Sequence, residues 1–130
     1  MQEKLIKLLE NSYSPYSKFR VAAIAVMKDG VEFVGVNVEN ASYGVTNCAE
    51  RSAIFSAISN GYKRHDFDKL YVMCDSNDIG TPCFICRQVI CEMFEKDRKV
   101  ICVTKSGKVK EFLESDLCPY PFDDDSLYDR

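Results

Sequence analysis

The sequence predicts an α/β protein: a three-layer α/β/α architecture with a mixed five-stranded sheet between helices. Three observations lead to this prediction. Apolar residues recur at helical spacing in three separate segments, and short apolar, β-branched runs of strand length lie between and after them. The turn signals Asp29-Gly30 and Ser106-Gly107 each separate two such runs. The length of 130 residues suits one domain, which we expect to cover residues 1–130.

The first part of the chain is predicted to form a helix followed by a hairpin. Residues 3–13 place apolar side chains on one helical face. Ser14-Pro15 ends this helix, because the residue before a proline avoids the helical region. Residues 19–27 and 31–38 are apolar runs on either side of the Asp-Gly turn, so they are predicted to be antiparallel neighbours.

The second part of the chain alternates helices with strands. Residues 48–60 carry an apolar helical stripe that ends at an Asn-Gly pair. A second helix is predicted to begin at Thr81-Pro82, with threonine as the N-cap and proline in the first turn. The apolar runs expected to form the other strands are residues 70–74, 100–104 and 109–113. Alternation of this kind places helices on both faces of one sheet.

Composition and charge exclude several classes of function. The net charge is -3, and no basic stripe of the kind that binds nucleic-acid polymers is visible. No apolar run is long enough to span a membrane, and the first residues do not resemble a signal peptide. The chain has seven cysteines, an odd number that does not suggest a disulfide framework. We therefore expect a cytoplasmic protein with reduced thiols, in which residues 123–125 form a solvated acidic surface.

Three cysteines and a glutamate form the pattern that carries the chemistry. Cys48 precedes Glu50 by two residues, and Cys83 and Cys86 follow a proline at the spacing of one helical turn. All three cysteines lie near predicted helix N-termini, where the helix dipole favours the thiolate. Three thiolates can hold Zn²⁺ tetrahedrally and leave the fourth position to water. Glu50 is close enough to act beside such a metal without ligating it.

Two further readings of these residues bear on the metal site. A closed structural zinc site would need a fourth ligand, for which Cys91, His65 and Cys74 are the candidates, but none has an obvious partner spacing. Arg51 is either a surface residue or a group that offsets the negative charge of a zinc ion with three thiolates. The other cysteines are expected to pack as apolar residues; they are Cys74, Cys91, Cys102 and Cys118.

Four motifs in order resemble those of the small, homotetrameric cytidine deaminases, and the resemblance covers nearly the whole chain. The motifs span residues 13–19, 37–43, 46–51 and 81–89. Membership in that family implies zinc bound by Cys48, Cys83 and Cys86, and hydrolysis of free cytidine and deoxycytidine. Glu50 would then move protons between the zinc-activated water, N3 of the pyrimidine and the departing ammonia.

The resemblance also implies residues that bind the substrate and a partner subunit. The main chain at Ala49 would read the pyrimidine edge, Phe19 would stack on or near the base, and Asn37 and Glu39 would hydrogen-bond the ribose. Tyr43 and Phe122 resemble residues that reach into a neighbouring subunit's site. Gln88 resembles a residue that supports the metal-binding helix. The expected partners are therefore a nucleoside and other copies of this chain, with neither a nucleic-acid polymer nor a membrane.

Two residues depart from the family pattern, and three alternative functions remain. Phe84 and Ile85 stand where the family has glycine and a small residue, so they are expected to pack against a subunit contact or the pocket wall.

The substrate could be another aminopyrimidine nucleoside such as blasticidin S. A polynucleotide deaminase would place a helix between the last two strands, where this chain has only residues 105–108. A non-catalytic zinc module is the third alternative, and Glu50 argues against it.

Overall fold

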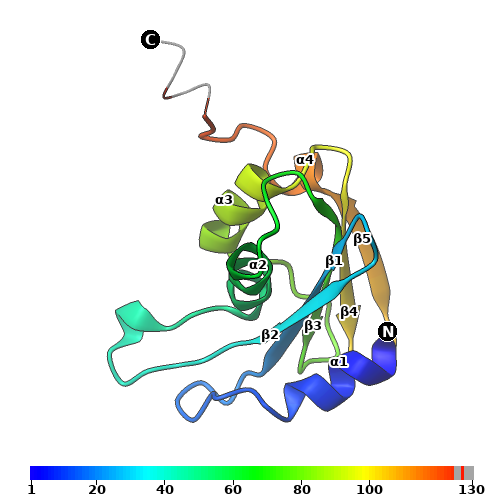
Figure 1. Ribbon diagram of the computed structural model, residues 1–130. Coiled ribbons are helices and arrows are strands. Elements are labelled where there is room, and N and C mark those ends of the chain that lie inside the picture. The colour runs from blue at the N-terminus through cyan, green and yellow to red at the C-terminus, as the bar shows by residue number, and fades with distance from the viewer. Residues whose placement is uncertain (125–126, 128–130) are drawn as a thin grey trace.

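The computed structural model describes residues 1–124 and 127, and it shows a five-stranded sheet with helices packed on both faces (Figure 1). In chain order the elements are α1 (Gln2–Leu9), β1 (Val21–Met27), β2 (Glu32–Val36), a 3-10 turn (Tyr43–Val45), α2 (Ala49–Ser59), β3 (Phe67–Cys74), α3 (Phe84–Met93), β4 (Lys99–Thr104), β5 (Val109–Leu113) and α4 (Glu114–Leu117). Among the described residues, every helix is too short or too polar to span a lipid bilayer.

The sheet is mixed, as predicted. Its strand order is β2-β1-β3-β4-β5, in which only β3 and β4 run parallel. The parallel pair is joined through α3, because a parallel connection needs a crossover. The two antiparallel hairpins turn at glycines with positive φ, Gly30 and Gly107, which only glycine adopts readily. The last two strands are therefore joined by a tight turn with no helix between them.

Alternation along β1 divides the core into two layers. Ala23 and Ala25 face α2 in one buried cluster, whereas Ala22 and Ile24 face the other side of the sheet, against α1. Figure 1 shows α1 below the sheet and α2 and α3 together on its opposite face. The predicted three-layer α/β/α architecture is confirmed.

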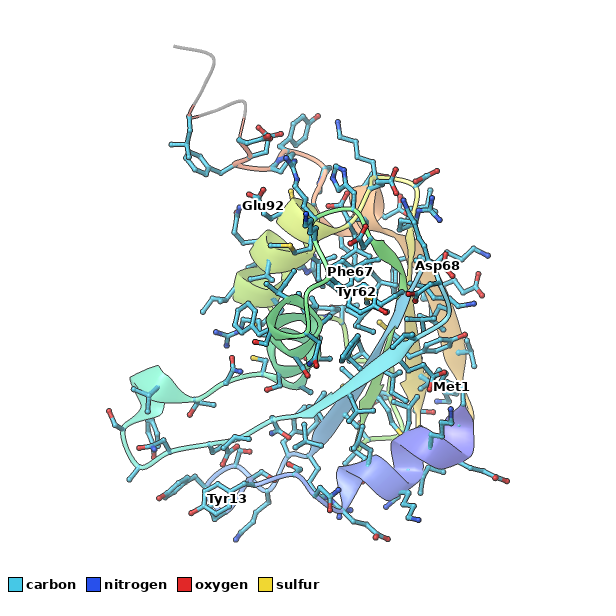
Figure 2. The ribbon with its side chains drawn as sticks, in the orientation of Figure 1. Met1, Tyr13, Tyr62, Phe67, Asp68 and Glu92 are labelled. Atoms are coloured by element: carbon cyan, nitrogen blue, oxygen red, sulfur yellow. The ribbon has the colours of Figure 1, made fainter. Side chains whose placement is uncertain are left out.

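Two helix boundaries differ from the sequence prediction. The helix predicted from Thr81-Pro82 begins at Phe84, because Cys83 serves as its N-cap and the Cys83 thiol accepts a hydrogen bond from the Cys86 amide at 3.5 Å. The first helix ends at Leu9, well before Ser14-Pro15. Tyr13 instead forms a bridge with Val38, and Figure 2 shows it on the outer edge of the molecule.

The last helix and the acidic tail also differ from expectation. The short helix α4 was not predicted, since four residues are too few to show a periodic pattern. Asp124 is half-buried and pairs with Arg64, whose Nη1 donates to Oδ2 at 2.8 Å. Asp125 lies outside the described residues. The prediction of a purely solvated acidic surface is therefore wrong at Asp124.

Gly35 in β2 lets α2 pack closely against the sheet. A Cβ at this position would lie 2.4 Å from the Ala49 carbonyl oxygen and 2.5 Å from the Ala53 amide nitrogen, so α2 would have to move. We expect Gly35→Ala to lower the free energy of unfolding by about 1–3 kcal/mol, as overpacking does. Urea denaturation measures this.

Gly44→Ala is the matched control for Gly35→Ala. A Cβ on Gly44 meets no atom within 4 Å. Its free energy of unfolding should therefore stay within about 0.5 kcal/mol of the parent. Equal stability of the two variants would contradict the close contact between β2 and α2.

Candidate active site

Three thiols from two helices converge at one point. Cys48 is the N-cap of α2, Cys83 is the N-cap of α3, and Cys86 lies in the first turn of α3. The three Sγ atoms lie within 4.8 Å of one another, and those of Cys48 and Cys83 are 3.8 Å apart. Both helices therefore direct their positive N-terminal ends at the same group of sulfur atoms.

This spacing fits a tetrahedral zinc site. Zinc bonds of about 2.3 Å in tetrahedral geometry place two sulfur ligands about 3.8 Å apart, which is the spacing of the Cys48 and Cys83 thiols. Hydrogen bonds from the Cys86 thiol and from Arg51 outweigh burial and lower the pKa of Cys48 to about 5. Cys86 itself is fully buried. The donor set thus has the sulfur chemistry, spacing and charge that zinc requires, with three protein ligands and a fourth position left open.

A buried carboxyl group accompanies the thiols. Glu50 lies in the first turn of α2 and is only 4% exposed. Burial, assisted by the nearby charge of Cys48, raises the pKa of Glu50 to about 7. A carboxyl group that titrates near neutral pH can both accept and return a proton, which is the requirement for an acid–base catalyst.

Arg51 lies against the same sulfur cluster. Its Nη2 donates to Cys48 Sγ at 3.3 Å, and its Nε is buried without a hydrogen-bond partner. The guanidinium group is thus directed at a ligand thiolate instead of at solvent. This arrangement matches the charge-compensating reading of Arg51 and not the surface reading.

A cavity of about 260 Å³ opens beside these groups. It brings together residues far apart in sequence, from the first loop to the start of α3. Its lining includes the predicted residues Phe19, Asn37, Glu39, Cys48, Ala49, Glu50 and Cys83. The cavity adjoins a second hollow of about 380 Å³, and Ser17, Glu39 and Thr46 line both. Together, the cavity and the adjoining hollow can hold a small molecule made of two linked groups.

Asn37 is held firmly at the cavity. Its Oδ1 accepts hydrogen bonds from the Val21 amide at 2.9 Å and from the Ser12 hydroxyl, and its Nδ2 donates to the Phe19 carbonyl at 2.8 Å. The amide nitrogen carries a second hydrogen, which remains for a ligand. Asn37 therefore joins β1 to the loop that carries Phe19.

Glu39 organises the neighbouring loop in a similar way. Its Oε1 accepts from the amides of Tyr16 at 3.0 Å and Ser17 at 3.1 Å, and its Oε2 accepts from the Ser17 hydroxyl. The hydrogen bond from the Ser17 hydroxyl is the main cause that lowers the pKa of Glu39. Glu39 is thus a charged acceptor at the cavity wall.

Three predicted site residues line neither the cavity nor the sulfur cluster. Tyr43 is 77% exposed and lines the adjoining hollow, where its ring meets the Tyr16 ring edge-on. Phe122 is 58% exposed and lies against α3, where its carbonyl oxygen accepts from Gln88 Nε2 at 2.6 Å. Within its own chain, Phe122 is therefore not part of the cavity, and Gln88 holds the tail.

Phe84 and Ile85 do not line the cavity, so they do not form its wall. They are 78% and 63% exposed, respectively. The Arg87 guanidinium lies over the Phe84 ring at 4.5 Å. Of the two places expected for these residues, the pocket wall is excluded in this chain.

Arg87 is a positioning residue that the sequence analysis did not single out. It donates to the Pro82 carbonyl at 2.8 Å, to Thr81 Oγ1 at 2.9 Å and to the Leu117 carbonyl at 3.1 Å. These bonds fix the segment that leads into Cys83. Its place one residue after Cys86 was a signal, but its acceptor at position 117 could not be read from local sequence. Also missed were the cavity-lining residues Cys74, Thr46 and Thr81.

The fold and the cavity together define a metal-dependent hydrolase, since an open metal position beside a buried acid–base group suits the activation of water. The model of the cytidine and deoxycytidylate deaminase zinc-binding region matches residues 1–104. The chain belongs to that family, whose cofactor is zinc.

Individual relatives agree over almost the full length. The cytidine deaminase of Halalkalibacterium halodurans is 42% identical over 127 residues, which cover 98% of this chain and 95% of that protein. The cytidine deaminase of Sporosarcina psychrophila is 40% identical over 129 residues, covering 96% and 93%. A crystal structure of cytidine deaminase from Burkholderia pseudomallei superposes with a TM-score of 0.88 at 41% identity, covering 92% of this chain and 94% of that one.

Proposed function

We propose that this chain hydrolyses free cytidine and deoxycytidine to uridine and deoxyuridine, with release of ammonia, in pyrimidine salvage. The observation that carries the proposal is the convergence of three thiols and the buried Glu50 at one cavity. Membership in the deaminase family and the similarity to proteins named cytidine deaminase support the substrate.

In the proposed mechanism Cys48, Cys83 and Cys86 hold the zinc ion and Glu50 moves the protons. When bound, zinc lowers the pKa of water to about 7 and so supplies a nucleophile at neutral pH. Glu50 would take one proton from the attacking water and deliver it to N3 of the pyrimidine while the water oxygen bonds to C4. It would then take the remaining proton of the new hydroxyl group and pass it to the amino group, so that the C4–N bond breaks, ammonia leaves and a C4 carbonyl forms. Arg51 keeps the sulfur cluster from becoming too negative.

The remaining cavity residues would bind and orient the nucleoside. The exposed ring of Phe19 would stack on the base and the main chain at Ala49 would read the pyrimidine edge, which is supported by the fact that both residues line the cavity. The second hydrogen of the Asn37 amide and the Glu39 carboxylate would bind the ribose hydroxyl groups. The described residues that line the cavity include neither lysine nor arginine, which favours an uncharged sugar over a phosphate.

Turnover with and without zinc tests the proposal. Purified protein should convert cytidine and deoxycytidine, seen as loss of ultraviolet absorbance and release of ammonia, and a chelator should abolish both signals. Deoxycytidylate, blasticidin S and a cytosine-containing oligonucleotide serve as competing substrates. Conversion of any of these in preference to cytidine by the zinc-loaded protein would contradict the proposed substrate.

We further propose that the chain assembles as a homotetramer in the cytoplasm, with Tyr43 and Phe122 reaching the sites of neighbouring subunits. Exposed apolar side chains on α2 and α3 support an interface there; they are Phe55, Ile58, Phe84 and Ile85. All seven cysteines are free thiols, as a reducing compartment would maintain them.

Light scattering should give the mass of a tetramer, and Ile85→Glu should lower that mass by burying a charge at the interface. Val109→Glu is the matched control, because Val109 is similarly exposed but lies on β5. A parent mass near that of one chain would refute the assembly.

A further inference from the structure

A second cluster of side chains that can bind a metal lies away from the cavity that contains Glu50. Cys91 is in the last turns of α3, Glu114 is the first residue of α4, and Cys118 follows the end of α4. One ligand atom from each lies within 4.8 Å of the other two. Figure 1 shows α3 and α4 side by side at this end of the molecule. Segments more than twenty residues apart in sequence are thus brought to one point.

One oxygen of the carboxyl group in this cluster lacks a hydrogen-bond partner, although the group also interacts with the Cys91 thiol. Glu114 is only 3% exposed, and its Oε1 is buried with no hydrogen bond. Leaving a buried polar atom unpaired costs about 1–3 kcal/mol, so each such atom in a folded protein calls for an explanation. Lys96 lies nearby but does not reach this oxygen within hydrogen-bond distance. A cation bound between the thiols and this carboxylate would satisfy it.

The cluster lines a pocket. A cavity of about 540 Å³ is lined by all three residues and also by His65. His65, the chain's single histidine, lines this cavity but is not one of the residues whose ligand atoms lie within 4.8 Å of one another. The same pocket is lined by the basic residues Arg64 and Lys96 and by the acidic residues Glu95, Asp123 and Asp124, and Arg64 is already paired with Asp124. The lining is therefore more acidic than basic, which favours a cation.

We infer that Cys91, Glu114 and Cys118 form a second zinc site, with water in the fourth position, that ties α3 to α4. Two sulfur ligands and one carboxylate select zinc over magnesium or calcium, which prefer oxygen ligands alone. The site uses none of the residues assigned to catalysis, so it stands or falls independently of the proposed reaction. It revises the expectation that Cys91 and Cys118 only fill apolar space.

The position of the site explains what it would do. Gln88, one helical turn before Cys91, donates to the Phe122 carbonyl, so the tail already lies along α3. A metal ion at Cys118 would fix this segment at its start. Figure 2 labels Glu92, the neighbour of Cys91, on the side of α3 near the tail. The second ion therefore holds the tail beside the helix that carries Cys83 and Cys86.

Metal stoichiometry tests the inference on the full chain. After equilibration with Zn²⁺ and removal of free ion, elemental analysis should find a second equivalent per chain. Glu114→Gln and Cys118→Ser should each weaken its binding by more than the roughly 10- to 100-fold that supporting groups around a metal contribute. Turnover should persist in both. Cys102→Ala is the control, because Cys102 is fully buried outside the cluster, and this variant should retain the second equivalent.

A measurement on the unmodified protein guards against variants that fail to fold. Added Zn²⁺ should protect Cys91 and Cys118 from alkylation, as read by peptide mass spectrometry, in protein whose first equivalent is already bound. A single equivalent of zinc, or alkylation of both thiols unaffected by the second equivalent, would overturn the inference even if cytidine is turned over. Two equivalents without turnover would instead contradict only the proposed reaction.

Discussion

Glu50→Gln is expected to remove nearly all turnover while leaving zinc bound. Glutamine has the same shape as glutamate, so α2 and the cavity should keep their form. It cannot accept the proton from water or deliver one to N3, however, and general acid–base groups contribute about 10²- to 10⁴-fold to a rate. We expect kcat to fall by at least this factor, measured by ammonia release, with the zinc content of the parent.

The control for Glu50→Gln is Glu111→Gln on β5. Glu111 is exposed, pairs with Lys99 at 3.2 Å and belongs neither to the cavity lining nor to a metal-ligand cluster. Its loss should leave kcat unchanged, since exposed ion pairs contribute little. Parent-like turnover by Glu50→Gln would refute the proton-transfer role. Loss of zinc from that variant would instead show that the carboxylate helps to hold the metal.

Cys86→Ala is expected to lose the catalytic zinc and with it all measurable turnover. Catalytic zinc sites have three protein ligands, and removing one leaves Cys48 and Cys83 alone. Metal binding also contributes to the free energy of folding, because the unfolded chain does not offer a formed site. We therefore expect a lower melting temperature as well as the loss of one equivalent of zinc by elemental analysis.

Cys102→Ala separates loss of metal from loss of a buried sulfur. Cys102 is as fully buried as Cys86, but it lies on β4 and belongs to neither metal-ligand cluster. This variant should show a packing cost without losing zinc. If Cys86→Ala and Cys102→Ala retained equal zinc, the proposed ligand set would be wrong.

The fold could be predicted where local patterns decide the structure. The two Gly turns, the apolar strands and the helix from Cys48 all rest on neighbours in sequence, and they appear at the expected places. The start of α3 was misplaced, because the threonine and proline before it suit an N-cap and first turn in isolation. In the structure Cys83 is the N-cap, and Thr81 instead lines the cavity.

The site could be predicted only in part, for the same reason. The Cys48, Glu50, Cys83 and Cys86 pattern is compact in sequence, and the structure brings it together. The contacts that support it are not local. Gly35 reaches α2 from a different element, and Arg87 finds its acceptor at Leu117. Cys91 and Cys118 gave no spacing signal, since the chain between them forms two strands before α4 returns to α3.

The hydrogen bonds of Arg87 link the C-terminal segment to the loop that carries the metal-binding Cys83. One guanidinium group joins the approach to Cys83 with the carbonyl of Leu117, so the two cannot shift independently. Shortening the chain before Leu117 would therefore disturb the metal-binding loop, although the truncation lies more than thirty residues away in sequence. We therefore expect fusions at this terminus to require an intact α4, whereas the hairpin turn at Gly107, where an added Cβ would meet no atom within 4 Å, lies outside the residues that line the cavity.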